Sequence, residues 1–450
     1  MLLKKNIAIV AAASALALTL SACGGPAAPS QGPASAPAGN QSTGELKNTG
    51  TTIWILSGGA TEAILVSSLE QWNTKYPDNK IEYQTMANDD FKNKIQTAVG
   101  AKNAPTLIYG WGATGTVMDY IKNDKIIDLT GKIPDLEARV IPSVIDAGKI
   151  DGKIWAAPAT QSQPVILYYN KDLFTQAGVT APIATWDDLI ASIPKFKAIN
   201  VAPFALAGAS KWPDLMWIEM LTDRIGGPQP FINVVANKPD AWSDPAFAQA
   251  LTKIQDLVKA GGIVDSFGTI VADANADVAL VHSGKAAMLL QGSWSYGSFK
   301  QDAPDFVSAG KLGAFQFPTV AGGAGDPKNI AGNPCNYLSV SADATADQQA
   351  TALKFLNEMV ENEAAVKALV DAGGVPPTKD AKAVMDASAD KAFFDIAFPM
   401  IEEAPSFQLS WDQAISPVQA QELLTNLDKI FMLQITPDEF VANMNKVIGK

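Results

Sequence analysis

One stretch decides how the rest of the chain is arranged: QPVILYYNKDLFTQAGVTAPIATWDDLI, residues 163–190. Its apolar run, Val165–Tyr169, indicates a buried strand, and a short helix is expected to follow it. Gly178 ends that helix, because glycine adopts the left-handed conformation of a helix C-terminus without strain. Thr185 then caps a second helix, with Asp188 in the place that Glu or Gln takes in a capping box. The elements before and after can be placed relative to this block.

Upstream of the block, strands and helices alternate. Strands are expected at Thr52–Leu56, Ile81–Gln84 and Pro105–Tyr109, and amphipathic helices at Glu62–Tyr76 and Asp90–Val99 lie between them. This β-α-β-α-β order predicts a parallel, doubly wound sheet. Ligands bind beyond the carboxyl ends of the strands in such sheets, a rule that selects the loops Ser57–Thr61, Thr85–Asp89 and Gly110–Gly115.

Downstream, the same reasoning predicts helices at Trp186–Ile193, Leu215–Arg224, Asp244–Ala260 and Thr345–Ala368, and strands at Ala286–Leu290, Leu312–Phe315 and Tyr337–Val340. Residues 320–329 are glycine-rich and contain Asp-Pro, which indicates a hinge. Val418–Gly449 is predicted to form two helices that Pro437 separates.

The N-terminus carries the features of an export signal. Two lysines precede the apolar run Ile7–Leu20, which is too short for a permanent membrane-spanning helix, and small residues precede Cys23. We therefore expect residues 1–22 to be a cleaved signal peptide. Residues 24–48 are rich in Gly, Pro, Ala and Ser, so the segment 23–50 is expected to be a flexible linker.

The composition narrows the choice of partners. The chain has 450 residues, 47% of them hydrophobic, which suits a sizeable core and two or three domains. Removal of residues 1–22 takes away two lysines and no acids, and changes the formal charge from −12 to −14. An acidic chain repels nucleic acid and anionic lipid, so no nucleic acid partner is expected. The only arginines, Arg139 and Arg224, are few for a site that binds an anionic ligand.

No residue pattern points to catalysis or metal binding. Cys335 is the only other cysteine if Cys23 carries a covalent modification, so no intramolecular disulfide is expected, and His282 is the only histidine. One histidine is too few for most metal sites. Adjacent acids such as Glu402 and Glu403 point to different faces of a helix and are typical of solvated surface. We therefore expect no enzyme activity, no metal and no cofactor.

The tryptophans give the strongest functional signal, because several of the 10 fall at loop edges beside Gly, Pro and amide residues. Sugar rings present apolar C–H faces and a rim of hydroxyls, so their sites combine flat aromatic side chains with amides and carboxylates. The candidates on this ground are Trp111 after the third strand, Gln291 and Trp294 at the end of a later strand, and either Trp212 or Trp217, of which Trp217 is taken as the site residue. A position in the core is the alternative for each tryptophan.

Two motifs carry a resemblance to a known family. Residues 163–190 resemble the "lyYNkdlf…aG…TWdEl" signature of the extracellular solute-binding proteins of family 1, the maltose-binding-protein-like lipoproteins that deliver sugars to ABC importers. Leu20-Ser21-Ala22-Cys23 resembles a bacterial lipobox, which implies that Cys23 is lipidated and anchors the mature protein to the cell membrane. An ordinary secretory signal with an incidental cysteine is the alternative. One departure, Pro182-Ile183-Ala184 where the family often has Pro-Pro, changes a loop and no functional residue.

The resemblance covers about residues 51–445. It implies an α/β fold of the periplasmic-binding-protein type II, in which two doubly wound α/β lobes are joined by a hinge. By that resemblance residues 51–162 and 319–365 form the first lobe, and residues 163–318 and 366–450 form the second.

The same resemblance implies a function. An extracytoplasmic monomer would capture a mono- or oligosaccharide between the lobes and deliver it to the transmembrane subunits of an ABC permease. Relatives place a sugar-stacking tryptophan where this chain has Trp294, and the other contacts implied are Gln163, Asn333, Asn336, Trp411 and Asp412.

Two alternatives stay open. A lipid-anchored glycoside hydrolase would use two carboxylates in the cleft. The same binding fold could also take a polyamine or a metal chelate, and a cleft lined by acids instead of aromatics and amides would favour the polyamine.

Overall fold

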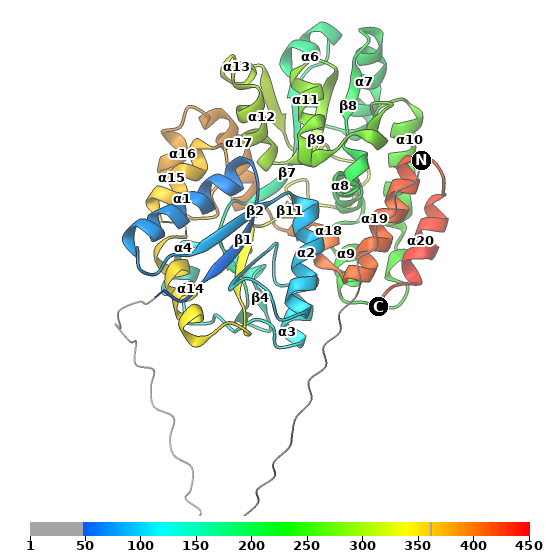
Figure 1. Ribbon diagram of the computed structural model, residues 1–450. Helices are drawn as coiled ribbons and strands as arrows, with labels where there is room; N and C mark the ends of the chain where they lie inside the picture. Colours follow the sequence, from blue (N-terminus) through cyan, green and yellow to red (C-terminus); the bar gives the residue numbers. More distant parts are fainter. Residues whose placement is uncertain (1–47, 361) are drawn as a thin grey trace, which may run out of the picture. The chain divides into compact units, whose positions relative to one another are not determined.

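The computed structural model describes residues 48–360 and 362–450 (Figure 1). The expected signal peptide (1–22), the lipidated Cys23 and the linker up to residue 47 lie outside the described residues.

The first sheet confirms the predicted β-α-β-α-β unit. Strand β1 (Thr52–Leu56) pairs in parallel with β2 (Glu82–Met86) and with β3 (Leu107–Gly110). The connecting helices are α1 (Gly59–Lys75) and α2 (Asn88–Gly100). The sheet continues with two antiparallel strands, β12 (Tyr337–Val340) and β6 (Ala157–Pro158), in the order β2-β1-β3-β12-β6.

Residues 163–170 form the central strand of the second sheet. Strand β7 (Gln163–Asn170) is almost completely buried, and its neighbours give the order β13-β11-β7-β9-β8, with β10 also paired to β7. These neighbours are β8 (Ala202–Ala205), β9 (Ala286–Gly292), β10 (Leu312–Phe315), β11 (Ile330–Asn333) and β13 (Phe407–Leu409). The sheet is mixed, since β7 runs antiparallel to β9, β10 and β11, whereas β8–β9 and β11–β13 are parallel.

The helix end at Gly178 and the cap at Thr185 are confirmed, but Asp188 does not complete a capping box, because its Oδ2 accepts from the Thr185 hydroxyl at 2.6 Å and not from the backbone N–H of Thr185. Asn170 caps α6 (Lys171–Ala177) by accepting hydrogen bonds from two backbone N–H groups, and Gly178 ends the helix at φ 62°. Thr185 caps α7 (Trp186–Ala198) by accepting a bond from the N–H of Asp188 at 3.1 Å. These contacts satisfy the backbone groups that helix ends leave without partners.

The predicted helix over Thr345–Ala368 is wrong in one respect. Two helices occur there, α14 (Ala346–Glu358) and α15 (Glu363–Asp371). The side chain of Asn362 accepts a hydrogen bond from the N–H of Ala365 at 2.8 Å and thereby starts the second helix. The predicted break at Pro437 is confirmed, because α19 (Pro417–Phe431) and α20 (Pro437–Asn445) flank it.

The remaining elements surround the two sheets. The other α-helices and strands are α3 (Thr116–Lys122), α4 (Leu136–Arg139), α5 (Pro142–Asp146), β4 (Lys149–Ile150), β5 (Lys153–Ile154), α8 (Leu215–Gly226), α9 (Gln229–Val235), α10 (Pro245–Lys259), α11 (Ala276–His282), α12 (Trp294–Asp302), α13 (Pro304–Ser308), α16 (Lys382–Asp386), α17 (Lys391–Glu402) and α18 (Trp411–Ala414). Short 3-10 helices are η1 (Gly208–Ser210), η2 (Trp212–Asp214), η3 (Ala241–Ser243), η4 (Phe267–Thr269) and η5 (Ala272–Ala274).

Buried aromatic residues pack the helices against the two sheets. On one side of the first sheet, α1 packs against α15 (Figure 1), and Trp72 of α1 meets Phe355 of α14 edge-on with ring centroids 5.8 Å apart. A second core joins α8, α10, α19 and α20, and its largest fully buried side chains are Trp217, Trp242 and Trp411. Burying such large apolar surfaces is the main favourable term in folding.

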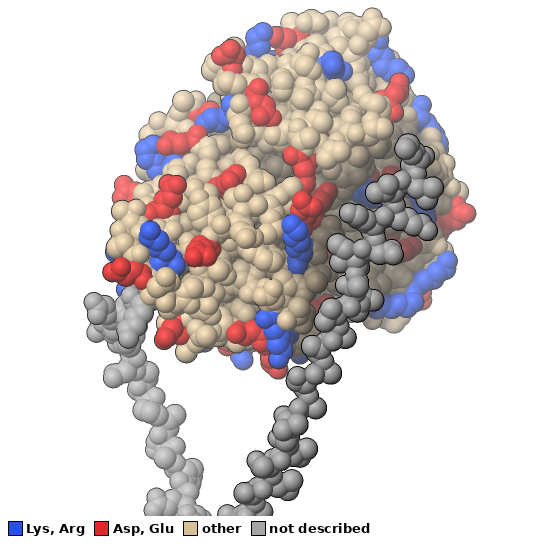
Figure 2. Space-filling model, in the orientation of Figure 1, with Lys and Arg blue, Asp and Glu red and all other residues tan. Residues whose placement is uncertain are grey.

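Charged side chains of both signs are interspersed over the face of the molecule drawn in Figure 2, which shows no continuous basic patch. Within residues 48–360 and 362–450, no helix combines the length and hydropathy that crossing a membrane requires. The same residues contain no cluster of three or more His, Cys, Asp or Glu side chains arranged to hold a metal ion.

Candidate ligand-binding cleft

A cavity of about 410 Å³ lies where the ends of the two sheets meet. All three loops selected by the strand-end rule contribute to its lining, with Gly58 after β1, Asn88 after β2 and Trp111 after β3. The second sheet supplies Gln163 at the start of β7 and Gln291 near the end of β9. The volume of the cavity is within the range of small-molecule sites.

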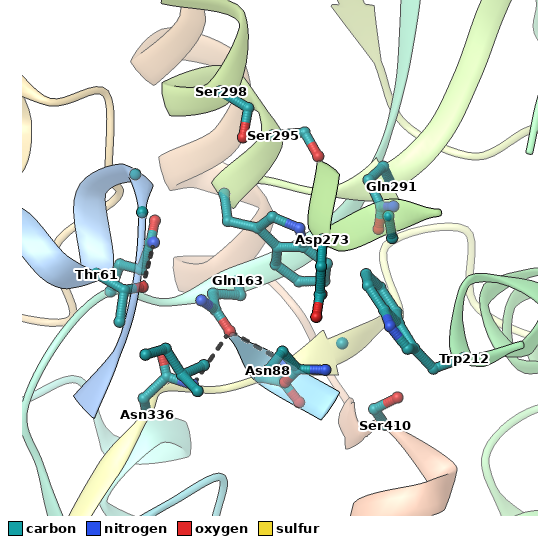
Figure 3. A pocket seen from close by; sticks show the side chains of 18 of the residues that line it. Thr61, Asn88, Gln163, Trp212, Asp273, Gln291, Ser295, Ser298, Asn336 and Ser410 are labelled. Atoms are coloured by element: carbon teal, nitrogen blue, oxygen red, sulfur yellow. Dashed lines mark hydrogen bonds between the residues drawn. The ribbon is translucent and has the colours of Figure 1, made fainter. Parts of the chain in front are cut away.

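Gln163 is held in place by two amides that lie far away in the sequence. Its Oε1 accepts hydrogen bonds from Nδ2 of Asn333 at 3.0 Å and from Nδ2 of Asn336 at 3.4 Å (Figure 3). Thr160 in turn donates its hydroxyl to Oδ1 of Asn336 at 2.8 Å. The arrangement leaves the amide nitrogen of Gln163 without a protein acceptor among the described residues, and Oδ1 of Asn333 without a donor. The amide nitrogen of Gln163 is therefore available to a ligand, whereas Oδ1 of Asn333 is buried.

Gln291 is engaged mostly within the protein. Its Nε2 donates to Oδ2 of Asp277 at 3.1 Å, and its Oε1 accepts from the N–H of Gly292 at 3.2 Å. Burial raises the pKa of the Asp277 carboxyl above its ordinary value, although the bond from Gln291 opposes that shift. Both side chains line the cavity.

Three tryptophans face the cavity: Trp111, Trp212 and Trp294. All three are partly exposed, and the rings of Trp212 and Trp294 lie next to each other with centroids 5.9 Å apart. Figure 3 shows Trp212 opposite Thr61, with the amide of Gln163 between them in the view. The indole N–H of Trp212 has no partner among the described residues. Flat faces and fixed polar groups thus share one cavity.

Two of the predicted contacts, Trp217 and Trp411, lie in the core and not in the cavity. Both are fully buried. Trp217 of α8 packs edge-on against Phe204 with centroids 4.9 Å apart, because its helix face covers the second sheet. Trp411 stacks on Phe231 with centroids 4.2 Å apart and rings inclined by 9°. The interpretation of these two tryptophans as ligand contacts is therefore corrected.

Asp412, the neighbour of Trp411, does line the cavity. Its Oδ2 lies 3.0 Å from Nζ of Lys92, and that ammonium also lies 5.2 Å from the ring centroid of Trp111. The side chains of Lys92 and Asp412 are 27% and 7% exposed. The one basic side chain in the cavity lining is thus already paired with an acid.

Glu219 is a cavity residue that the sequence analysis missed. Its Oε1 accepts bonds from the N–H of Trp411 at 2.8 Å and from the hydroxyl of Ser410 at 3.0 Å, whereas Oε2 has no partner among the described residues. Complete burial raises its pKa to about 8. An acid in the middle of the apolar run Leu215–Leu221 was the signal that could have identified it.

The other missed residues come from loops and helix ends. Gln161 donates to the hydroxyl of Thr61 at 2.9 Å, and its Oε1 is unpartnered among the described residues. Asn88 and Asp273 also line the cavity, and Oδ2 of Asp273 accepts from the N–H of Asp89 at 3.3 Å. Taken together, the lining is rich in amides, hydroxyls and aromatic faces.

Comparison with known sequences identifies the family. Residues 68–395 match the family described as bacterial extracellular solute-binding protein. A multiple sugar-binding protein of Streptococcus mutans is 25% identical over 327 residues, 70% of this chain and 72% of that protein. A xylose/arabinose-binding protein of Haloferax volcanii is 25% identical over 261 residues, 55% of this chain and 53% of that protein. An uncharacterized ABC transporter extracellular-binding protein of Pyrococcus horikoshii is 27% identical over 276 residues, 60% of each chain. The chain thus spans three-fifths or less of the latter two relatives.

Solved structures agree on the fold. One from work on xylan utilization by the thermophilic bacterium Caldanaerobius polysaccharolyticus matches with a TM-score of 0.77 and 29% identity, covering 89% of this chain and 100% of that chain. A chitin oligosaccharide binding protein matches with a TM-score of 0.78 and 21% identity, covering 88% and 98%. These proteins share the type II periplasmic-binding fold of two α/β lobes that the resemblance implied. The chain belongs to the bacterial extracellular solute-binding proteins.

Proposed function

We propose that this protein is the substrate-binding lipoprotein of an ABC importer and that it captures a mono- or oligosaccharide. The observation that carries the proposal is the meeting of Trp111, Trp212 and Trp294 with the fixed amides of Gln163 and Asn333 in one cavity. Aromatic faces stack on the C–H faces of a sugar ring, and amides donate to and accept from neighbouring hydroxyls. The names of the Streptococcus and Haloferax relatives support the same ligand class.

The charges in the cavity favour a neutral ligand. Lys92 is paired with Asp412, so no free cation is offered to a phosphate or a carboxylate. Burial raises the pKa of Glu219 to about 8 and raises that of Asp277 above its ordinary value, which disfavours the charged form of both acids and leaves Asp273 as the exposed acid of the lining. We therefore prefer a saccharide to the polyamine.

Binding without chemistry is the role that we propose. A sugar that contacts elements of both sheets would bind a closed arrangement more tightly and shift the population toward it. We propose lobes close to residues 51–162 with 319–365 and residues 163–318 with 366–450, with two changes. Strand β11 would go with the second lobe because it pairs with β7, and α15 would go with the first lobe because it packs against α1. The closed monomer would then dock on the transmembrane subunits of the permease, held at the membrane through lipid on Cys23.

Isothermal titration against a panel of mono- and oligosaccharides tests the proposal. We expect at least one sugar to bind and to raise the melting temperature, because a ligand that binds only the folded state stabilises it. The absence of heat and of any thermal shift across the panel would reject a sugar ligand. Release of reducing sugar from a bound oligosaccharide would support the hydrolase instead.

A further inference from the structure

A second cavity of about 460 Å³ adjoins the first. Five residues line both cavities: Lys92, Trp111, Trp212, Asp412 and Gln413. The second cavity lies between α2, the loop after β3 and α3 on one side and α18 with α19 on the other. The paired charges of Lys92 and Asp412 therefore stand at the junction of the two spaces.

Two backbone segments approach each other closely at Gln413, which lines both cavities. Gly115 has φ 57°, and a Cβ added there would lie 2.1 Å from the backbone oxygen of Gln413. Only glycine allows this contact, which brings the loop after β3 against α18. Gln413, Trp111 and Trp212 line both cavities beside this contact.

The lining of the second cavity is polar and nearly free of unpaired charge. Amide and hydroxyl side chains predominate, including Gln96, Thr97, Thr114, Thr116, Ser210 and Gln421. Asp89 is the one acid apart from Asp412, and Lys92 is the one base. Such a lining suits a ligand with many hydroxyls and no charge, and it does not suit a lipid or a phosphate.

We propose that the two cavities form one groove that binds a linear oligosaccharide, with inner rings in the first cavity and outer rings in the second. This inference rests on the proposed function and narrows the ligand from any mono- or oligosaccharide to a linear oligosaccharide. A single ring would occupy one cavity and leave the other to water, whereas a chain that passes Trp111 and Trp212 contacts both. Added rings then contribute contacts without a second loss of translational freedom.

Titration with saccharide series of increasing length tests the groove. Malto-, xylo-, cello- and chito-oligosaccharides, from the single ring to the hexasaccharide, are compared on the full mature chain. We expect affinity in the preferred series to rise by about tenfold or more between the shortest ligand that binds and the longest, and then to level off. A single ring that binds as tightly as every longer member of its series would overturn the inference and leave the proposed function intact.

Two substitutions separate the second cavity from the first. Gln96→Leu on α2 and Gln421→Leu on α19 remove amides that line only the second cavity, and both side chains are exposed. Gln434→Leu is the matched control, because Gln434 is exposed just after α19 and lines neither cavity.

The double variant Gln96→Leu/Gln421→Leu should weaken the longest ligand by about tenfold and leave the shortest ligand unchanged, while the control changes neither. The groove would be overturned if the double variant bound the longest ligand as tightly as the wild type does. If no saccharide of any length binds the wild type, the proposed function itself fails, and this inference falls with it.

Discussion

Nζ of Lys92 and Oδ2 of Asp412 lie 3.0 Å apart and join the first sheet's helix α2 to helix α18, which follows strand β13 of the second sheet. The ammonium also lies 5.2 Å from the ring centroid of Trp111. The pair therefore connects elements of both sheets at a point where two cavities meet.

A double-mutant cycle with Lys92→Met and Asp412→Asn should show a coupling of about 1 kcal/mol, since the pair is partly buried and is supported by a cation–π contact. The coupling is measured from the free energies of unfolding in urea. Lys367→Met and Asp371→Asn form the control cycle, because that pair is more than half exposed. Its coupling should stay below about 0.5 kcal/mol. Equal couplings in the two cycles would show that the Lys92–Asp412 pair stabilises the fold no more than an exposed ion pair does.

Replacement of a cavity tryptophan should weaken sugar binding more than it weakens the fold. For Trp294→Ala we expect a loss of about 2 kcal/mol in binding free energy, roughly 30-fold in Kd, because aromatic anchors dominate such contacts. Titration with the best ligand of the panel measures it. Trp155→Ala is the control, since Trp155 is also partly buried but lines neither cavity. A Kd that changes equally in both variants would remove Trp294 from the site.

Replacement of a core tryptophan should weaken the fold more than it weakens sugar binding. Trp411→Ala removes a ring that stacks on Phe231 and contacts Trp242, and should lower the free energy of unfolding by about 3–5 kcal/mol. Trp411→Phe keeps an aromatic ring and should cost less. Urea unfolding measures both variants. Loss of sugar affinity in a Trp411→Phe protein of wild-type stability would restore the original interpretation of Trp411 as a ligand contact.

The sequence was sufficient for features that depend on local patterns. The alternating strands and helices around β1, β2 and β3 follow from hydrophobic periodicity, and the cap at Thr185 follows from side-chain chemistry. The three loops at the strand ends follow from the parallel order of the sheet, and each contributes to the cavity. These inferences need no knowledge of distant contacts.

The missed features depend on long-range packing. Trp212 and Trp217 flank one Pro-Asp pair, and only the position of α8 on the second sheet decides that Trp217 is buried and Trp212 faces the cavity. Trp411 and Asp412 are neighbours in the sequence, yet Trp411 is buried in the core and Asp412 lines the cavity, and only the packing of α18 decides this difference. The cavity position of Glu219 requires the contact between α8 and α18, which lie almost 200 residues apart (the hydrogen-bonded residues are separated by 192).

Cys23→Ser should release the protein from the membrane and leave sugar binding unchanged. The expectation rests on the resemblance of Leu20-Ser21-Ala22-Cys23 to a lipobox and on the proposed lipid anchor, because a diacylated cysteine would anchor by burying its chains in the bilayer. Fractionation of cells that express either form measures it, with the wild type expected in the detergent-soluble membrane fraction. Membrane association that persists in Cys23→Ser would point to an anchor elsewhere.

Glu219 should make stability fall as pH rises through the neutral range. Its pKa is about 8 in the folded protein and near 4.5 in an exposed chain, so between these values the folded state holds a proton that the unfolded state has lost. Unfolding then releases a proton, and the free energy of unfolding decreases with pH by up to about 1.4 kcal/mol per pH unit. Other buried acids with raised pKa values, such as Asp214, act in the same direction.

Glu219→Gln isolates the contribution of this one group. The amide oxygen can accept the same bonds from Trp411 and Ser410 and does not titrate, so the variant should gain stability relative to wild type from about pH 5 to about pH 9. Melting temperatures across that range measure the gain. Glu402→Gln controls for net charge, since Glu402 is exposed at the end of α17 and should give a curve parallel to the wild type. A parallel curve for Glu219→Gln as well would show that the carboxyl of Glu219 titrates alike in the folded and unfolded chain.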